Sequence, residues 1–132
     1  MQFLKHYLIA FIVFILIDLV WLLFISKKLY SDNIGHLMAD KVNIPAAAIF
    51  YLLYIAALVF FVISPAVVKQ SLLYALGAGA FFGLVAYATY DLTNLATLKD
   101  WPVSLTAIDL LWGSFVTGAT CFIATWISGK IQ

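Results

Sequence analysis

The chain has 132 residues, of which 66% are hydrophobic and only 10% are charged, and its mean hydropathy is +1.11. Soluble domains carry about 25% charged residues, so a soluble fold could not bury this excess of apolar side chains. The net charge of +1 excludes the basic surface that nucleic-acid binding needs. The single cysteine, Cys121, excludes an internal disulfide and a cysteine-based metal cluster. We expect the lipid bilayer as the solvent, and no cofactor.

Four continuous apolar stretches are long enough to cross about 30 Å of hydrocarbon as helices. They cover residues 7–25, 44–63, 71–90 and 103–127, and the helices that contain them are expected at about 3–26, 44–64, 70–92 and 102–127. Barrel strands would alternate apolar and polar residues instead of running continuously. The first stretch is too long for a cleaved signal peptide and is expected to stay as an anchor. We therefore predict a single all-α membrane domain over residues 1–132, a polytopic bundle of four transmembrane helices.

Prolines, a cap and an aromatic residue mark the predicted helix ends. Pro45 suits the first turn of the second helix, where its missing N–H is not needed, and Ser64-Pro65 is expected to end that helix. Asp100 is a candidate cap of the fourth helix, and Trp101 is expected to anchor the chain at the membrane interface.

The first loop, residues 27–43, is the longest. On a helix, one of its faces would carry Tyr30, Ile34, Leu37 and Met38, and the opposite face would carry Asp32, Asp40 and Lys41. This pattern predicts a short interfacial helix on the membrane surface, with an ordinary polar loop as the alternative. Four spans put both termini on one side. The lysines divide four against three between the two sides, so the positive-inside rule assigns no orientation.

Small residues recur every four positions on the third and fourth helices. The third helix carries Ala75, Gly79 and Gly83, and the fourth carries Gly113, Thr117 and Cys121. Small faces let helix backbones approach closely in lipid. We expect the two faces to pack on each other within one chain, and the alternative is that one of them forms a homodimer.

Aspartates interrupt the apolar pattern in one half of the bilayer. Asp18 and Asp109 lie within the first and fourth stretches, at similar depths of roughly 10–14 Å from the face that carries the first and third loops. Asp91 ends the third stretch on that same face. A mid-helix aspartate costs roughly 2.5–3.5 kcal/mol on insertion scales, and no lysine lies within the four stretches. These carboxyls are expected to be protonated, to share protons, or to hold a cation or the polar group of a ligand.

Aromatic and amide side chains accompany the aspartates. Trp21 and Trp112 follow Asp18 and Asp109 by three residues, in two similar strings, IDLVW and IDLLW. The antiparallel helices should turn Trp21 toward the loops and Trp112 toward the bilayer centre. The candidate ligand-binding or proton-handling residues are Asp18, Asp91, Asn94, Asp109, Tyr51, Tyr54, Tyr87, Tyr90, Trp21 and Trp112. The structural alternative is that the aspartates clamp helices together. No metal site is predicted, although Asp18, Asp91 and Asp109 would be the ligands if one existed.

The string YATYDLTNLATL at residues 87–98, followed by Trp101-Pro102, resembles a family signature. It is similar to that of the small bacterial membrane proteins catalogued as domain of unknown function 2177. The aspartate and tryptophan of the first and fourth helices, and the string FYLLY at residues 50–54, are similar too. The resemblance covers nearly the whole chain. It implies a multi-pass protein of the bacterial inner membrane and supplies no activity.

Three functions fit these observations. The first is a pocket that binds or modifies an amphiphile, such as a lipid, quinone or isoprenoid, whose polar head meets the aspartates. The second is a small proton- or cation-coupled transporter that acts as a dimer. The third is a structural or assembly subunit of a membrane complex. The sequence shows no nucleophile–base pair, so it does not say whether the protein is an enzyme; acid–base work by a carboxyl would be the simplest chemistry.

Overall fold

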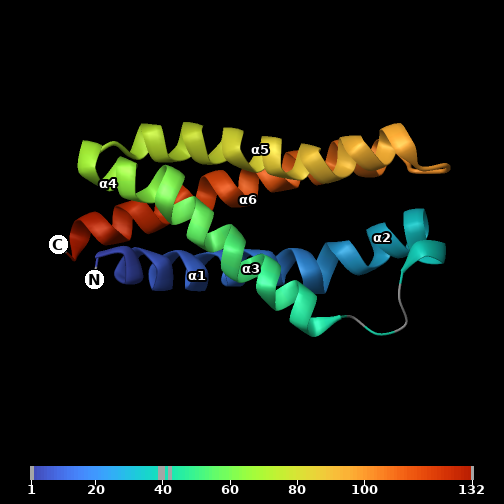
Figure 1. The fold of residues 1–132 in the computed structure, drawn as a ribbon, viewed down its shortest axis with the longest axis horizontal. Coiled ribbons are helices and arrows are strands. Elements are labelled where there is room, and N and C mark those ends of the chain that lie inside the picture. The colour runs from blue at the N-terminus through green and yellow to red at the C-terminus, as the bar shows by residue number, and fades with distance from the viewer. Residues whose placement is uncertain (1, 39–40, 42, 132) are drawn as a thin grey trace.

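The computed structural model describes residues 2–38, 41 and 43–131, which form a bundle of helices (Figure 1). The helices are α1 (Gln2–Trp21), α2 (Lys27–Ile34), α3 (Ile44–Leu58), α4 (Ser64–Lys69), α5 (Leu72–Thr97) and α6 (Val103–Lys130). Within the described residues, four helical segments are long and apolar enough to cross a membrane: Gln2–Leu37, Ile44–Lys69, Leu72–Thr97 and Val103–Lys130. The predicted all-α bundle of four spans is confirmed.

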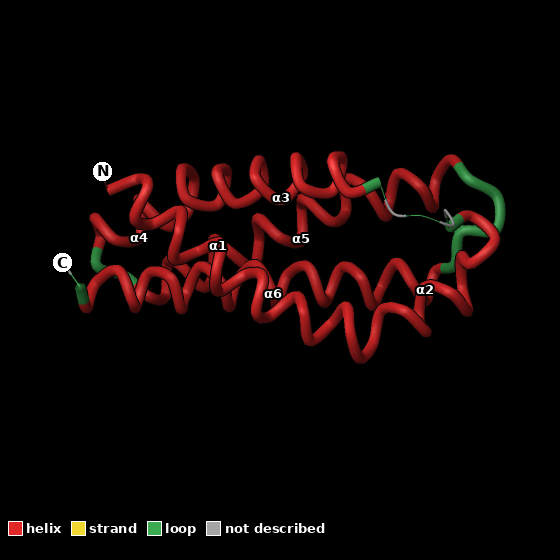
Figure 2. The backbone as a smooth tube through the Cα atoms, turned by 90° about the horizontal axis from the view of Figure 1, so that it is seen from below, coloured by secondary structure: helices red, strands yellow, loops and turns green. Residues whose placement is uncertain are grey.

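The four spans run up and down, so that both termini lie at the same end of the bundle (Figure 1). We call this the terminal end, and the opposite end, which carries α2 and the turn between α5 and α6, the loop end. Helices α5 and α6 pack against each other along much of their length, and α1 packs on α6. Figure 2 shows the same bundle from below, with α3 along one side.

The first span is longer than its apolar stretch because the helix does not stop at the lysines that follow it. A π-helical turn at Leu22–Ser26 joins α1 to α2. Such a turn inserts one residue into the helical register, and the buried positions Trp21, Ser26 and Ile34 follow this shift. The helix predicted in the first loop is present as α2. It continues α1, however, and Tyr30 and Ile34 pack inward against the α5–α6 turn. Asp40, assigned to the opposite face, lies outside the described residues.

The second span also continues beyond its expected end. Pro45 lies in the first turn of α3, as predicted, and the side chain of Asn43 caps that helix by accepting from the Ala46 N–H at 3.1 Å. The helix does not end at Ser64-Pro65. A π-helical turn at Val59–Ile63 precedes the proline and accommodates its missing N–H. Helix α4 then continues to Lys69, and it ends where Gln70 adopts a left-handed conformation with φ 54°.

The turn between α5 and α6 corrects two further expectations. Asp100 does not cap α6; the cap position is Pro102, and Asp100 itself adopts a left-handed φ of 61°. Trp101 is 7% exposed and packs with Ile34 instead of anchoring at an open interface. Its indole N–H donates to the Thr106 hydroxyl at 3.0 Å. The cause is α2, which covers this turn and replaces the headgroups as its neighbour.

The small faces of α5 and α6 pack on each other, as predicted. A Cβ added at Gly79 would lie 2.9 Å from the Cys121 Cβ, and one added at Gly83 would lie 2.7 Å from the Thr117 Cβ and overlap the Gly113 carbonyl oxygen. The Ser114 hydroxyl also donates to the Ala80 carbonyl of α5 at 3.0 Å. The small faces of α5 and α6 are therefore already in contact within one chain, and neither is left open for the homodimer that was the alternative.

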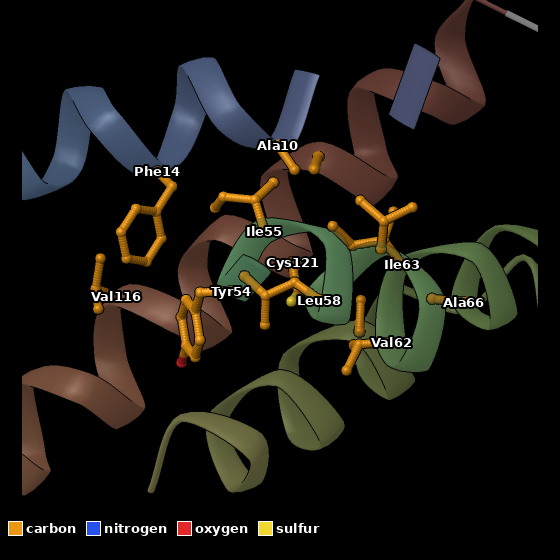
Figure 3. Packing of buried hydrophobic residues seen from close by; sticks show 13 residues of the cluster. Ala10, Phe14, Tyr54, Ile55, Leu58, Val62, Ile63, Ala66, Val116 and Cys121 are labelled. Atoms are coloured by element: carbon orange, nitrogen blue, oxygen red, sulfur yellow. The ribbon is translucent and has the colours of Figure 1, made fainter. Parts of the chain in front are cut away.

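The distribution of side chains is that of a protein dissolved in lipid. Large apolar residues such as Phe24, Val68 and Leu73 are about 80% exposed: 79%, 83% and 80%. Buried polar residues include His6, Asp18, Ser26, Asp91, Thr106, Asp109, Thr117, Thr120, Thr125 and Ser128. An apolar core of α1, α3 and α6 side chains fills the terminal half, where Phe14, Ile55 and Val116 point toward one another (Figure 3). The chain is a multi-pass membrane protein.

Candidate functional site

Asp18 of α1 lies in the deeper of two polar layers. Its side chain is 6% exposed, and its Oδ2 accepts a hydrogen bond from the Tyr51 hydroxyl of α3 at 2.6 Å. The indole of Trp112 on α6 also lies beside this carboxyl. Asp18 therefore joins α1 to α3 and α6, as the structural alternative of an interhelical clamp requires.

Asp109 of α6 lies in the second layer, nearer the loop end. It is 4% exposed, and the Tyr30 hydroxyl of α2 donates a hydrogen bond to its Oδ1. The indole of Trp21 lies beside Tyr30, and the carboxyl of Asp91 on α5 lies beside Asp109. This layer brings two carboxyls together, whereas the deeper layer has one.

A pair of stacked tryptophans separates the two layers. The rings of Trp21 and Trp112 have centroids 4.5 Å apart and planes tilted by 9°. Asp18 lies three residues deeper than Trp21 on α1, and Asp109 lies three residues nearer the loop end than Trp112 on α6. At 1.5 Å per residue the two aspartates differ in depth by about 9 Å. The expectation that they lie at similar depths does not hold along the bundle, because the first span continues past Lys27 as α2 and its loop end lies farther from Asp18 than the sequence indicates.

The two similar strings, IDLVW and IDLLW, acquire a structural role in this arrangement. On antiparallel helices, residues three apart share a face, so the tryptophans of the two strings meet while each aspartate lies beyond the partner's tryptophan. By chain order, Trp21 lies nearer the loop end than Asp18, and Trp112 lies nearer the terminal end than Asp109. The result is a local two-fold relation between α1 and α6 around the stacked rings.

Asp91 is the least satisfied side chain of the site. It is fully buried, and among the described residues neither of its carboxyl oxygens has a hydrogen-bond partner. It faces Asp109 without the distance and angle of a formed hydrogen bond. A buried polar group without a partner costs about 1–3 kcal/mol. A group that is kept at such a cost is a reasonable candidate for contact with a ligand.

A cavity of about 220 Å³ opens beside Asp109. Its wall is mostly aromatic and consists of Tyr30, Phe50, Tyr54, Ala86, Tyr87, Tyr90 and Asp109. The ring of Tyr87 lies directly against Gly113 of α6. A side chain at Gly113 would overlap this ring, so the glycine leaves the space that Tyr87 occupies beside the cavity. Phe50 and Tyr90, 51% and 57% exposed, form the rim. Since Phe50 belongs to α3 and Tyr90 to α5, the cavity opens sideways between these helices, which diverge toward the loop end (Figure 1).

An apolar groove continues from this cavity along the same pair of helices. Its volume is about 390 Å³, and its lining residues are Phe61, Val62, Ala78, Phe81, Phe82, Val85 and Ala86. Ala86 lines both the cavity and the groove. Phe82 of the groove packs against Tyr54 of the cavity, with ring centroids 5.8 Å apart. A mostly aromatic cavity with one buried carboxyl in its wall and an apolar groove therefore adjoin between α3 and α5.

Not all of the candidate residues from the sequence meet at this cavity. Tyr54, Tyr87, Tyr90 and Asp109 line it; Asp91 lies behind Asp109, and Asn94 lies beside Tyr90. Asp18 and Tyr51 belong to the deeper layer, and the tryptophans separate the layers. Among the described residues, no group of three or more histidines, cysteines and acids is arranged to hold a metal ion.

Sequence reasoning missed Tyr30 as a site residue. Ser26, Tyr30 and Ile34 stand at four-residue intervals, which is a usable signal in the sequence, but Lys27 and Lys28 indicate that the span ends before Tyr30. Phe50 was also missed, since an aromatic residue near a helix start is typical of the membrane interface.

The clamp at Asp18 leads to a prediction. Replacing Tyr51 with phenylalanine should lower the free energy of unfolding by about 1 kcal/mol, because interhelical hydrogen bonds in membranes contribute about 0.6 and at most about 1.7 kcal/mol. Titration of the purified protein with sodium dodecyl sulfate, followed by circular dichroism, measures this. Tyr74→Phe is the control, because the Tyr74 ring lies over the Lys69 ammonium at 4.0 Å and phenylalanine keeps that face. Equal stability of the two variants would argue against the clamp.

Neither the curated proteins nor the solved structures contain a significant match to the chain. A family model described as predicted membrane protein (DUF2177) matches residues 3–126, which is nearly the whole chain. The resemblance carried by YATYDLTNLATL and Trp101-Pro102 is thereby confirmed: the chain belongs to this family of membrane proteins, domain of unknown function 2177.

Proposed function

We propose that the protein binds an amphiphilic small molecule between α3 and α5. The observation that carries the proposal is the continuity of the two spaces: an aromatic cavity with Asp109 in its wall adjoins an apolar groove at Ala86. A molecule with a polar head and an apolar tail matches both. Ligand sites combine a mostly apolar lining with a few polar groups in this manner.

The head would meet Asp109 and the surrounding tyrosines, whose hydroxyls can donate or accept hydrogen bonds. Asp91 lies behind Asp109 and adds a second carboxyl with unused hydrogen-bonding capacity. The tail would lie along Phe82 and Val85 in the groove and continue into the bilayer. Asp18, which already has Tyr51 as its partner and does not line the cavity, acts as a structural clamp in this proposal.

The packing of the terminal half favours a protein that binds a ligand from the bilayer, and it argues against one that transports an ion or proton across the bilayer. Between the aspartates and the terminal end, side chains such as Ile55, Leu58 and Val116 are fully buried against one another. A transported ion or proton would have to cross this core. The side opening between α3 and α5 gives a bilayer-dissolved molecule direct access instead. The family resemblance to small bacterial proteins leads us to propose the bacterial inner membrane as that bilayer.

Native mass spectrometry of the protein released from lipid nanodiscs would test the proposal. We expect the wild-type protein to retain a small amphiphile, and Asp109→Asn to lose most of it, because the amide removes the acidic group from the cavity wall. Asp32→Asn is the matched control, since Asp32 is an exposed aspartate of α2 outside the cavity.

Equal retention by the wild-type and Asp109→Asn proteins would overturn the site. If the variant instead loses a co-purifying protein subunit while ligand retention is unchanged, an assembly role replaces ligand binding. Circular dichroism of each variant shows that a loss of ligand is not a loss of fold.

A further inference from the structure

We propose that the head group of the bound amphiphile is an organic cation, an ammonium of the trimethylammonium type. This inference rests on the proposed function and narrows its ligand class. It follows from two independent properties of the cavity: an aromatic wall and a buried carboxyl pair behind it.

The aromatic wall is the first property. Rings from three helical segments surround a space of about 220 Å³: Tyr30, Phe50, Tyr54, Tyr87 and Tyr90. The Tyr54 ring stacks with Phe50 at 5.4 Å and meets Tyr87 edge-on at 6.5 Å, so their ring planes differ in orientation around the cavity. An ammonium within about 6 Å of an aromatic face is attracted by the ring quadrupole, and cages of several rings recognise quaternary ammonium groups.

The second property is the charge of the cavity wall. Asp109 is 4% exposed, and Asp91 beside it is fully buried, with no hydrogen-bond partner for either oxygen in the part of the chain that the structure describes. The four apolar stretches contain no lysine, and the whole chain contains no arginine. A bound ammonium and one ionised carboxylate of the pair form a neutral unit, which lowers the cost of burying either charge. A phosphate, sulfate or carboxylate head would meet the Asp109 carboxyl in the cavity wall, with Asp91 next to it, and none of the lining residues is basic.

The size of the cavity limits the head further. Pockets for drug-sized ligands span about 300–1,000 Å³, and this one is smaller, while the adjoining groove of about 390 Å³ is apolar. A compact ammonium head fits the small cavity, and a single alkyl tail fits the apolar groove. A bulky ring head, such as that of a quinone, fits it less well.

The experiment compares two probes that differ in charge alone. One is dodecyltrimethylammonium, and the other is its uncharged carbon isostere, with a tert-butyl group in place of trimethylammonium. Binding of each radiolabelled probe is measured on protein in nanodiscs, with empty nanodiscs subtracted. We expect the ammonium probe to bind the wild-type protein at least about tenfold more tightly, a factor equal to about 1.4 kcal/mol, which lies between the values for an exposed and a desolvated cation–π contact.

Two variants separate the contributions of the carboxylate and the rings. Asp109→Asn should remove most of the preference for the ammonium probe. Tyr90→Phe keeps the ring at the rim and should keep the preference, whereas Tyr90→Leu should reduce it about threefold or more. Phe24→Leu is the control, because Phe24 is an aromatic residue that is 79% exposed to lipid and does not line the cavity.

The outcomes distinguish this inference from the proposed function. Saturable binding of both probes with equal affinity would overturn the cation head and leave an amphiphile site in place. A tenfold preference that persists in Asp109→Asn would also overturn it, since the charge recognition would lie elsewhere. Saturable binding of neither probe, together with no amphiphile retained by the wild-type protein, would overturn the proposed function itself.

Discussion

Replacing Gly83 with leucine is expected to force α5 away from α6 and to lower the free energy of unfolding by about 3 kcal/mol, at the upper end of the range for overpacking. The Cβ alone would overlap the Gly113 carbonyl oxygen and lie 2.7 Å from the Thr117 Cβ and Oγ1. The neighbour is backbone, which cannot move aside as a flexible side chain can. Denaturation in sodium dodecyl sulfate, followed by circular dichroism, measures the loss.

The matched control for this prediction is Gly77→Leu, on the same helix. A Cβ at Gly77 meets nothing within 4 Å, and the position is exposed to lipid. Leucine there should change stability by less than about 1 kcal/mol, the scale of an intrinsic helix preference. If Gly83→Leu keeps full stability and changes only the oligomeric state in light scattering, the small face joins two chains and the interface within one chain is wrong.

The interface between α5 and α6 illustrates why much of the fold could be predicted from the sequence. The spans follow from continuous apolar stretches, and the small faces follow from a four-residue spacing. Both are local properties of the chain. The pairing of Gly79 with Cys121, and of Gly83 with Thr117, then needed only the antiparallel order of consecutive spans. Membrane helices form before they associate, so local pattern and topology determine a large share of the result.

The candidate site was less predictable, because its geometry depends on one residue of register. The π-helical turn Leu22–Ser26 contains no proline or glycine that would mark it. Without that turn a regular helix would present a different face beyond Trp21, and Tyr30 would not reach Asp109. The π-helical turn also determines which face of α2 meets Trp101. In this register Ile34 of α2 packs against Trp101 and helps to bury it. Neither contact could be derived from a window of a few residues.

Sequence reasoning did predict which side chains of the third and fourth spans come together. Asp91, Asp109 and Tyr87 meet as anticipated, because the first, third and fourth spans all bring their acids toward the loop end. Separating Asp18 from them required the stacked tryptophans, whose contact joins residues 91 positions apart in the chain. The difference matters for function: the carboxyl of Asp18 belongs to a clamp, and the carboxyl of Asp109 belongs to the wall of a cavity, with Asp91 beside it.

Replacing Trp21 with alanine is expected to have the second large effect, a loss of about 2–3 kcal/mol in the free energy of unfolding. Truncation of a buried aromatic residue costs about 3–5 kcal/mol in soluble cores, and the figure is lower here because lipid is as apolar as the site from which the ring is removed. What is lost is the stack with Trp112, at 4.5 Å and 9°, and the indole beside the Tyr30 hydroxyl.

The control for the tryptophan is Trp126→Ala. Trp126 belongs to α6 but is 50% exposed near the terminal end, so its loss should cost less than about 1 kcal/mol. A double-mutant cycle of Trp21→Ala with Trp112→Ala should give a coupling of about 0.5–1.5 kcal/mol, the range for aromatic pairs. Additive losses would mean that the rings do not stack in the membrane. The separation between the clamp at Asp18 and the cavity at Asp109 would then lose one of its physical supports, since the stacked rings lie between the two carboxyl layers.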